Sequence, residues 1–381
     1  MKKALIITME YPPQIGGIAT YTHDMADVMD KNNTIVLAPI WHDKIEQKKF
    51  DGRVKYKTIR ANFLYKNIIW PRWLKLFFKV RKIVREENIE VLLIHHALPV
   101  GYIGVLIKIL SGVPFLLFSH GTDLTSGISS RWKKMMMNFV CKGSQKIFFN
   151  SNSLMRRFQE NFSGFDDKSV VLYPCPERDF LEAPDREVIE ELRRNYALIG
   201  KQVILSVGRF DEGKGFLHLL RIMPKLVERF PNLVWILVGD GPKKDQIIKN
   251  IQSLGLQNNI RYIGQVEHDE LKKYYYLADL FVLLTHPNKG REEGLGLVFL
   301  EASAAALPVV AGRSGGTKES VLDGKTGFVV NTDAEKEVFD TVVTLLRNPS
   351  FAEKIGYNGK KRIISEFNWQ EQIKKLEPYL K

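Results

Sequence analysis

Short apolar runs of strand length alternate with segments of helical periodicity along the whole chain, and this alternation constrains the fold more than any other feature. Strands buried on both faces read as nearly continuous apolar runs, and parallel strands need helical crossovers. The sequence therefore predicts an α/β fold, with parallel sheets covered by helices on both faces. The expected strands are Ala4–Thr8, Thr34–Ala38, Val91–His95, Phe115–His120, Lys146–Asn150, Val170–Tyr173, Val203–Val207, Val234–Val238, Ile260–Ile263, Leu280–Leu284, Pro308–Ala311 and Phe328–Val330.

The length of 381 residues suits about two domains of ordinary size. Pro174, Pro176 and Pro184 cluster near the middle of the chain, and prolines interrupt both strands and helices. We therefore expect a linker over 174–184, a first domain over residues 1–178 and a second over 185–365.

Composition excludes several classes of protein. Hydrophobic residues make up 45% and charged residues 26%, as in globular proteins with ample core. The two cysteines, Cys141 and Cys175, are too few for a disulfide framework, which favours a reducing compartment. The N-terminus is typical of a first strand and not of a signal peptide. No apolar run reaches the roughly 18 residues that span a bilayer.

The formal net charge of +13 is distributed unevenly. Residues 1–178 hold 27 Lys and Arg against 15 Asp and Glu, whereas residues 179–381 hold 29 against 28. An anionic surface or polymer is therefore the expected partner of the first half. A merely well-solvated basic face is the alternative. No nucleic-acid-binding module is present, so we expect no nucleic-acid partner.

Residues 60–85 carry eight basic side chains, several aromatic ones and no acidic one. A helix is predicted from Pro71 because proline suits a first turn. The 3.6-residue period places Arg72, Lys75, Lys79 and Lys82 on one face and Trp73 on the apolar face. Such a helix can lie on an anionic membrane surface. It can equally be a surface helix whose apolar side is core. A second basic and apolar helix, over 131–142, would widen the surface.

Glycines follow two of the expected strands. Gly16 and Gly17 precede a helix predicted over 18–29 and allow close approach to a ligand, although an ordinary tight turn explains them equally well. In the second half, Arg209 and Lys214 lie between glycines after Val203–Val207. Arginine binds phosphate through two N–H groups and lysine as a point charge, so this pair can neutralise a diphosphate.

One histidine is a candidate for a ligand contact. His120 ends an expected parallel strand and is followed by glycine, which places it at the edge of the sheet where α/β proteins bind ligands. It could donate to or accept from a sugar hydroxyl, although a lone histidine is more often structural. His95 and His96 also end a strand, but no glycine follows them, so they rank lower.

The segment from Arg291 to Glu319 brings most of the remaining chemistry together. Glu293 and Glu301 lie eight positions apart around a helix start at Gly296 and Leu297. A second glycine turn, Gly315–Gly316, is predicted to open another helix at Thr317. Two helix N-termini at one sheet edge would suit a diphosphate. If the ligand is a nucleoside diphosphate linked to a sugar, Glu301 could accept from ribose hydroxyls and Glu293 from sugar hydroxyls; capping or salt bridging is the alternative.

Two further observations would bear on a nucleotide ligand. The backbone near Val266 follows a strand and could read the edge of a nucleobase. No Asp-x-Asp sequence occurs, so a carboxylate-held divalent cation bridging the phosphates is not expected.

Several of these motifs together resemble the family 4 retaining glycosyltransferases. They are the glycine pair at 16–17, GR-x4-KG at 208–215, E-x7-E at 293–301, GGTKE at 315–319 and DGKTGFVV at 323–330. In this order, the motifs span nearly the whole chain. The resemblance implies two Rossmann-like domains facing across a cleft, the GT-B fold, with a C-terminal helix over 366–381 that crosses back to the first domain. PPQIGGIATY and GREEGLGLVFLEA look most like the branch that mannosylates phosphatidylinositol lipids.

The resemblance also implies roles for individual residues. Arg209 and Lys214 would bind the diphosphate, Glu301 the ribose and Glu293 the sugar. Further residues would surround the donor and the acceptor: Gly316 and Thr317 near phosphate or sugar, Gly17 near phosphate, His120 near the transferred sugar, and Glu10 near the acceptor. Family members retain the anomeric configuration, and a front-face departure of the leaving phosphate is the common proposal.

We expect a retaining hexosyltransferase that moves a mannose- or glucose-type hexose from a GDP- or UDP-hexose. The acceptor would be a membrane glycolipid or a lipid-linked envelope saccharide. No other cofactor and no metal is expected, and the enzyme would be cytoplasmic and peripheral on the inner face of the cell membrane. The alternatives are a nucleotide-sugar epimerase or a phosphorylase of the same fold, or a non-catalytic binder of anionic polymer or membrane.

Overall fold

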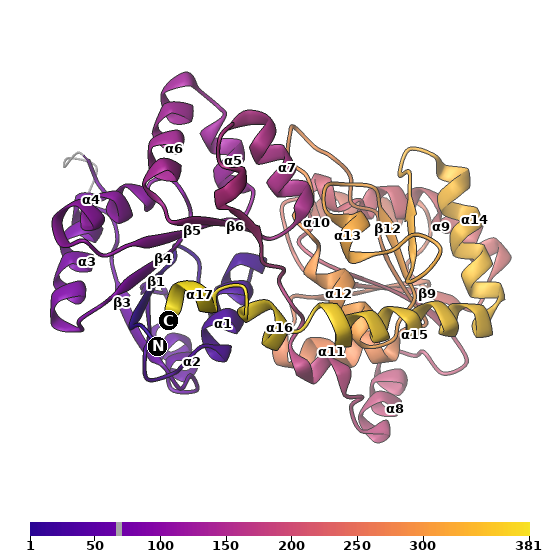
Figure 1. The fold of residues 1–381 in the computed structure, drawn as a ribbon. Helices are drawn as coiled ribbons and strands as arrows, with labels where there is room; N and C mark the ends of the chain where they lie inside the picture. The colour runs from indigo at the N-terminus through magenta and orange to yellow at the C-terminus, as the bar shows by residue number, and fades with distance from the viewer. Residues whose placement is uncertain (66–70) are drawn as a thin grey trace. The chain divides into compact units, whose positions relative to one another are not determined.

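The computed structural model describes residues 1–65 and 71–381, which form two compact units. Unit 1 consists of Met1–Pro174 together with Trp369–Lys381, and unit 2 consists of Cys175–Asn368. Part of the basic and aromatic segment, residues 66–70, lies outside the described residues. Figure 1 gives the element labels used below.

In the described part of unit 1, seven strands form one parallel sheet in the order β3-β2-β1-β4-β5-β6-β7. This order, with the chain starting in the middle and winding outward in both directions, is that of a doubly wound Rossmann-like sheet. The strands are β1 (Ala4–Ile7), β2 (Thr34–Pro39), β3 (Lys57–Ala61), β4 (Val91–His95), β5 (Phe115–Ser119), β6 (Lys146–Phe149) and β7 (Ser169–Val171).

Helices connect these strands and cover the sheet (Figure 1). They are α1 (Gly17–Val28), α2 (Lys44–Asp51), α3 (Leu74–Glu86), α4 (Gly101–Ser111), α5 (Thr122–Gly127), α6 (Arg131–Gly143) and α7 (Asn152–Asn161), with α16 (Trp369–Ile373) and α17 (Glu377–Leu380) returning at the C-terminus. The return is held by hydrogen bonds: Lys2 N donates to Leu380 O at 2.6 Å, and Tyr173 N donates to the Gln372 side chain at 3.0 Å.

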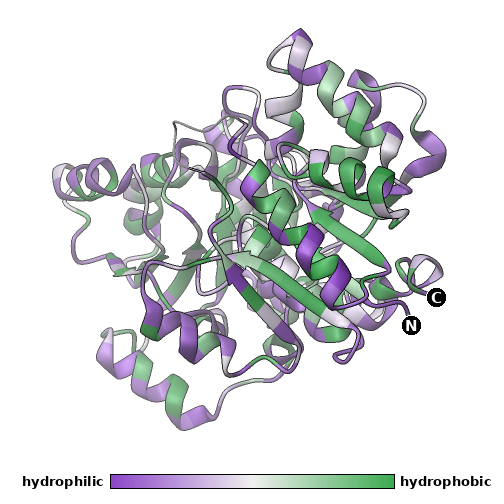
Figure 2. Ribbon diagram, turned by 90° about the vertical axis from the view of Figure 1, so that its left-hand side faces the viewer, coloured by the Kyte–Doolittle hydropathy of each residue, from purple (hydrophilic) through white to green (hydrophobic). Residues whose placement is uncertain are grey.

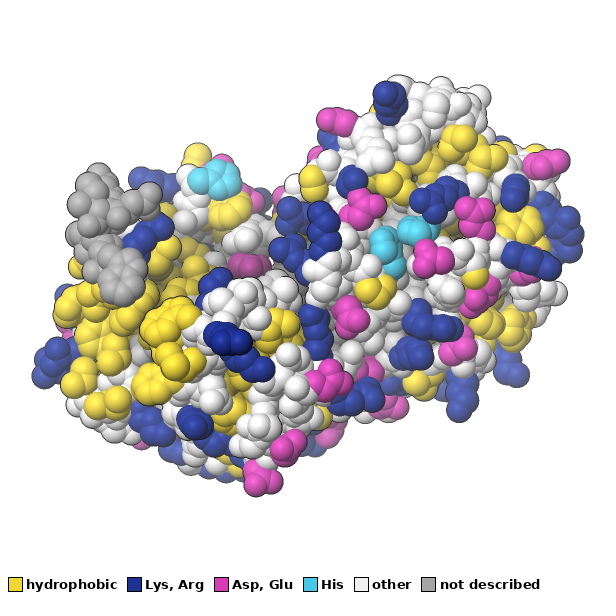
Figure 3. All heavy atoms as spheres, turned by 90° about the horizontal axis from the view of Figure 1, so that it is seen from above, with side chains coloured by type: hydrophobic (Ala, Val, Ile, Leu, Met, Phe, Trp, Pro, Cys, Tyr) yellow, Lys and Arg dark blue, Asp and Glu magenta, His cyan; other side chains and the backbone are white. Residues whose placement is uncertain are grey.

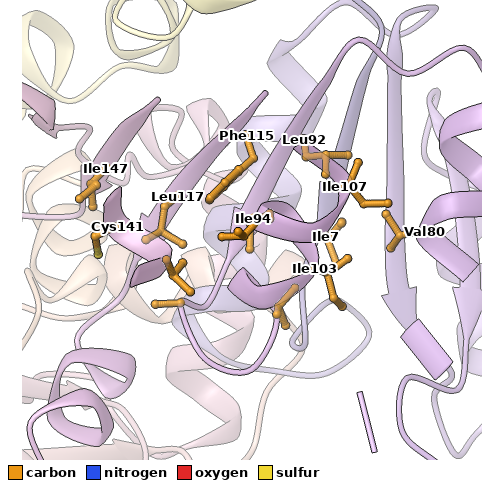
Figure 4. Close-up of a cluster of buried hydrophobic side chains, with 14 of the residues drawn as sticks. Ile7, Val80, Leu92, Ile94, Ile103, Ile107, Phe115, Leu117, Cys141 and Ile147 are labelled. Atoms are coloured by element: carbon orange, nitrogen blue, oxygen red, sulfur yellow. The ribbon is translucent and has the colours of Figure 1, made fainter. Parts of the chain in front are cut away.

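The core of unit 1 lies between the sheet and its helices. Figure 4 shows side chains from β1, β4 and β5 meeting side chains from α3, α4 and α6. Ile7, Leu92 and Phe115 are fully buried, as expected for apolar runs that have no solvent-facing side. Figure 2 shows the same pattern, with hydrophobic strands inside and helices that are hydrophilic on one side.

Unit 2 repeats the arrangement. In its described residues a six-stranded parallel sheet has the order β10-β9-β8-β11-β12-β13. The strands are β8 (Gln202–Val207), β9 (Leu233–Val238), β10 (Ile260–Gly264), β11 (Leu280–Leu283), β12 (Val309–Gly312) and β13 (Phe328–Val330). The helices are α8 (Arg186–Asn195), α9 (Phe216–Arg229), α10 (Lys244–Ser253), α11 (His268–Leu277), α12 (Leu297–Ala304), α13 (Thr317–Ser320), α14 (Glu335–Arg347) and α15 (Pro349–Glu366).

The predicted fold class is confirmed, because each unit is a parallel α/β sheet wound in the same order. One strand was not expected. The sequence KTIRA of β3 lacks an apolar run, because β3 is an edge strand whose side chains are at most half-buried. The expected linker segment contains a short 3-10 helix, Arg178–Leu181, whose Phe180 is buried in unit 2.

Candidate functional site

The candidate donor residues of unit 2 lie where its sheet changes winding direction. Strands β8 and β11 are neighbours, and the chain winds outward from them in opposite directions. Ligands of open α/β sheets bind outside the carboxyl ends of strands at such a switch point. The loop 208–215 follows β8, and the loop 284–296 follows β11.

Lys214 and Glu293 form an ion pair between these two loops. The Lys214 Nζ lies 2.6 Å from Glu293 Oε2, and the two side chains keep 25% and 14% of their exposure. Burial alone would lower the pKa of Lys214, but the Glu293 carboxylate holds that pKa above its ordinary value. Lys214 therefore stays a cation at neutral pH. The pair places a cation, which can bind phosphate, beside a carboxylate, which can accept hydrogen bonds from hydroxyl groups.

The backbone of Glu293 is held by the glycine turn after β12. The Gly316 N–H donates to Glu293 O at 3.0 Å, and the Glu293 N–H donates to Ser314 Oγ at 3.1 Å. A Cβ at Gly315 or Gly316 would lie 2.1 Å from the carbonyl oxygen of Glu293 or Gly294. Only glycine permits this approach, so Gly315 and Gly316 position Glu293 through the backbone.

Helix α12 begins directly after this loop. Its N-cap, Gly296, has a left-handed backbone (φ 82°), and no side chain caps the first turn. The amides of Leu297 and Val298 therefore point out of an uncapped helix start, which favours an anion. The second helix expected here is a single turn, Thr317–Ser320, too short for a helix dipole. Thr317 is fully buried, and its Oγ1 accepts from Ser314 N at 3.1 Å.

Glu301 occupies the second turn of α12 and is 97% buried (3% exposed). The Tyr275 hydroxyl on α11 donates to Glu301 Oε2 at 2.6 Å. Burial raises the pKa of Glu301, while the His268 charge and the Tyr275 hydrogen bond act against this rise. A carboxylate in this position is costly for folding, and a ligand that donates hydrogen bonds would compensate the cost.

The other two candidates of unit 2 have fewer contacts. Arg209 is exposed in the loop after β8, and its guanidinium makes no hydrogen bond or ion pair with the described residues. Val266 is half-buried in the loop after β10. The structure thus joins Lys214, Glu293 and Gly316 directly and leaves Arg209 and Val266 at neighbouring strand ends.

In unit 1 the candidate residues also gather at strand ends. Glu10 follows β1, and its Oε1 lies 3.8 Å from His96 Nε2 at the end of β4. A Cβ added at Gly16 would lie 3.7 Å from Glu10 Oε2, so the glycine pair is next to the same carboxylate. His120 follows β5, and its Nε2 lies 3.0 Å from His95 Nδ1. Gly17, the first residue of α1, is exposed.

Two family models match the chain. The model described as glycosyltransferase family 4 matches residues 15–177, and the model described as glycosyl transferases group 1 matches residues 188–362. The chain belongs to the family 4 glycosyltransferases. Its GT-B type of fold agrees with the two Rossmann-like sheets described above.

Relatives of this glycosyltransferase match it along nearly its whole length. The GDP-mannose-dependent alpha-(1-6)-phosphatidylinositol monomannoside mannosyltransferase of Mycolicibacterium smegmatis is 27% identical over 387 residues, covering 99% of this chain and 97% of its own. The enzyme of the same name from Mycobacterium tuberculosis is 26% identical over 389 residues, covering 100% and 98%. The crystal structure of Anabaena Alr3699/HepE in complex with UDP-glucose has a TM-score of 0.84 at 18% identity, covering 100% and 99%.

The predicted membrane helix of the glycosyltransferase differs from expectation in two ways. Helix α3 begins at Leu74, so Arg72 lies before it, where its Nε donates to Tyr65 O at 3.0 Å. Trp73 packs against the core and lies 5.5 Å from the Tyr102 ring, so it is not an outward-facing aromatic residue. Phe78, 54% exposed, is the outward-facing aromatic residue of α3. Lys75, Lys79 and Lys82 are half-buried or exposed on the helix, as expected.

Three contacting residues were missed from the sequence: Tyr275, Ser314 and Thr22, whose Oγ1 lies 3.2 Å from His95 Nδ1. Tyr275 lies within the run 274–276, where helical spacing alone does not say which hydroxyl meets Glu301. Ser314 precedes the glycine turn, and its role depends on a loop twenty-one residues earlier in the chain. His95 ranked low because no glycine follows it, yet it directly contacts His120. The sequence held one signal for this contact: His95 ends a strand that neighbours β5, the strand that His120 follows.

In the described residues of the glycosyltransferase, no helix is long and apolar enough to cross a bilayer. Over the same residues, no group of three or more His, Cys, Asp or Glu side chains is arranged to hold a metal ion.

Replacing Glu301 by Gln is expected to raise the melting temperature of the ligand-free enzyme at neutral pH. Since the folded-state pKa of Glu301 is raised, ionisation of this carboxyl favours the unfolded state, and the penalty disappears as the pH falls and the carboxyl is protonated. Gln keeps an oxygen that accepts from Tyr275. Melting curves of both proteins between pH 4 and pH 8 test this; an equal difference at every pH would contradict it.

Proposed function

We propose that this enzyme is a retaining hexosyltransferase that transfers mannose from GDP-mannose to a membrane glycolipid of the phosphatidylinositol type. The observation that carries the proposal is the Lys214–Glu293 pair at the switch point of unit 2. It occurs in a chain that matches GDP-mannose-dependent phosphatidylinositol mannoside mannosyltransferases end to end. UDP-hexoses and lipid-linked envelope saccharides are the other donors and acceptors of the same class.

In this proposal unit 2 binds the donor. Arg209 and Lys214 neutralise the diphosphate as it leaves, and the uncapped start of α12 adds backbone N–H donors. Glu293 accepts from the hydroxyls of the sugar, and Glu301 accepts from the ribose. Because these cations and amides supply the positive charge, the reaction needs no carboxylate-held metal. Retention would follow from departure of the diphosphate on the face that the acceptor attacks.

The proposed roles in unit 1 rest on the family resemblance and on the cluster of residues at its strand ends. His120 acts toward the transferred sugar, Gly16 and Gly17 toward phosphate, and Glu10 toward the acceptor. Glu10 and Gly16 are close enough to each other to belong to one binding region.

The membrane part of the proposal is supported by the surface of α3, α4 and α6. Large hydrophobic side chains are exposed there: Phe78, Ile109, Leu110, Trp132, Met135 and Phe139 are each more than 50% exposed. Arg131, Lys133, Lys134 and Lys142 are exposed on α6 as well. Figure 3 shows hydrophobic side chains gathered between Lys and Arg side chains on unit 1, at the left of the view. Apolar side chains bordered by cations favour an anionic bilayer surface, which would place the enzyme on the inner face of the cell membrane.

A vesicle-binding experiment separates the contribution of the basic side chains from that of the exposed apolar side chains. Changing Arg72, Lys75, Lys79 and Lys82 together to Gln should weaken binding to anionic vesicles about tenfold or more at low salt, and less at high salt, since salt screens exposed charges. Changing Trp132 and Phe139 to Gln should weaken binding at both salt concentrations. The matched control changes four exposed cations of unit 2, Arg221, Lys225, Arg229 and Lys249, to Gln. Equal losses in the control would show that net charge alone is responsible.

A transfer assay tests the function itself. The enzyme is given GDP-mannose or UDP-glucose with phosphatidylinositol mannosides, and the product is isolated and its anomeric proton observed by NMR. The expected product is an α-mannosyl glycolipid formed from GDP-mannose. Hydrolysis of the donor without a glycolipid product, or a β-linked product, would contradict the proposal.

A further inference from the structure

A chain of hydrogen bonds in unit 1 ends at His120. The Thr22 hydroxyl donates to Ile18 O at 2.8 Å within α1. His95 Nδ1 lies 3.2 Å from the same hydroxyl oxygen and 3.0 Å from His120 Nε2. Thr22 and His95 are fully buried, and His120 is partly buried. The His95 and His120 rings lie within 19° of parallel with centroids 5.2 Å apart, so their facing nitrogens can share an in-plane hydrogen bond.

The position of each proton in this chain follows from its partners. A hydroxyl has one hydrogen, and Thr22 gives it to Ile18 O, so the Thr22 oxygen can only accept from His95. His95 Nδ1 must therefore carry a proton, which it shares between the Thr22 oxygen and His120 Nε2. A protonated Nδ1 has no lone pair in the ring plane, so His120 Nε2 must be the acceptor. His120 then holds its own proton on Nδ1, because a neutral imidazole has one N–H.

The opposite arrangement, in which His120 Nε2 carries the proton, places both ring nitrogens of His95 in unfavourable surroundings. If His120 Nε2 donated, the bare Nδ1 of His95 would face the lone pairs of Thr22. Its Nε2 would then bear a hydrogen, yet this atom is buried and has no hydrogen-bond partner in the described residues. A buried N–H without an acceptor is rarer than a buried acceptor without a donor. Burial lowers the pKa of His120 to about 3, and the His96 charge acts in the same direction. Burial lowers the pKa of His95 as well, and the charges of His120 and His96 act in the same direction, so both rings are neutral at physiological pH.

We propose that His95 is a positioning residue, which fixes His120 in the tautomer with its proton on Nδ1 so that this N–H donates to an oxygen of the sugar ligand. His120 Nδ1 makes no hydrogen bond to the described residues, so its proton is available to a ligand. The choice of tautomer depends only on the contacts above. The assignment of the ligand oxygen rests on the proposed function.

The test is NMR of the full-length enzyme with ¹⁵N-labelled histidine, without ligand. Multiple-bond ¹H–¹⁵N spectra distinguish the two neutral tautomers, and the His120→Gln variant identifies the signals of His120 among those of the eight histidines. The expected result is an Nδ1–H form of His120. Observation of the Nε2–H form in the wild-type enzyme would overturn the proposal, whatever the enzyme transfers.

Two variants of His95 add a functional readout. His95→Asn keeps an N–H near the position of Nδ1, whereas His95→Phe keeps a ring that can stack on Phe118 but removes the donor. We expect His95→Phe to release His120 to the Nε2–H form and to lower kcat about 10- to 100-fold, the range seen when the outer-shell partner of a metal-ligating histidine is removed. His95→Asn should restore both the tautomer and most of kcat.

Equal activity of the two variants would overturn the positioning role. An enzyme that lacks transferase activity but shows the Nδ1–H form would contradict only the proposed function. If His95→Phe does not fold, the wild-type spectrum still decides the tautomer.

Discussion

Replacing Glu293 by Gln, or Lys214 by Met, is expected to reduce sugar transfer on the order of 100-fold or more, the usual effect of removing one charged group that stabilises a transition state. In the proposed mechanism, Lys214 is the cation beside the departing diphosphate, and Glu293 would both orient Lys214 and accept from the sugar. Their 2.6 Å contact means that either change disturbs both roles. Initial rates of transfer at saturating acceptor measure the effect.

The stability of these variants distinguishes a catalytic role from a structural one. Removing one member leaves the other partly buried and unpaired, so each single variant should melt at a lower temperature than the double variant. The double variant should nevertheless be inactive. Glu292→Gln is the matched control, because Glu292 is the adjacent carboxylate and is exposed. Full activity in the Lys214 or Glu293 variants, or an equal loss in Glu292→Gln, would refute the assignment of the donor site.

Replacing Gly215 by Ala is expected to cause the largest loss of stability of any alanine substitution of a loop glycine in unit 2. Gly215 caps α9 directly after Lys214 and has a left-handed backbone, φ 71°. An added Cβ would lie 1.8 Å from Leu284 O, a backbone atom at the end of β11. The cost combines about 1–2 kcal/mol for the left-handed conformation with about 1–3 kcal/mol for the forced displacement. The melting temperature measures the sum.

The Gly200→Ala variant separates the cost of the left-handed conformation from the cost of the forced displacement. Gly200 has nearly the same backbone, φ 69°, but a Cβ there meets no atom within 4 Å. The loss of stability in Gly200→Ala should therefore equal the cost of the left-handed conformation alone. If the two variants melt at the same temperature, contact with β11 does not constrain the 208–215 loop, and the rigid placement of Lys214 would need another explanation.

The sheets were predictable because burial on both faces leaves a strong local pattern. The runs that became β1, β4, β8 and β9 are almost wholly apolar, and their order along the chain limits the possible topologies. Strand β3 was not predictable in this way, since an edge strand with half-exposed side chains need not be apolar. Helix α13 was overestimated, because a glycine turn predicts a helix start but not how far the helix continues.

The site was predictable as a set of strand-end residues, but its contacts were not. Glycine spacing and charge located Lys214 and Glu293, whereas their direct pairing depends on the packing of loops seventy-nine residues apart. The burial of Glu301 under Tyr275 likewise depends on how α11 packs against α12. Trp73 shows the same limit in unit 1: helical periodicity placed it on the apolar face, and only tertiary packing shows that it faces the core.

Nucleotide-sugar binding to unit 2 is tested most directly by melting curves of the wild-type enzyme and the Lys214→Met variant with GDP, UDP, ADP, GDP-mannose and UDP-glucose. A ligand that binds only the folded state stabilises it, by about 2.7 kcal/mol at one hundred times its Kd. We expect GDP-mannose to raise the melting temperature of the wild-type enzyme, and to raise that of Lys214→Met much less at the same concentration. No stabilisation by any nucleotide or nucleotide-sugar, or equal stabilisation of both proteins, would contradict a donor site built on Lys214 and Glu293.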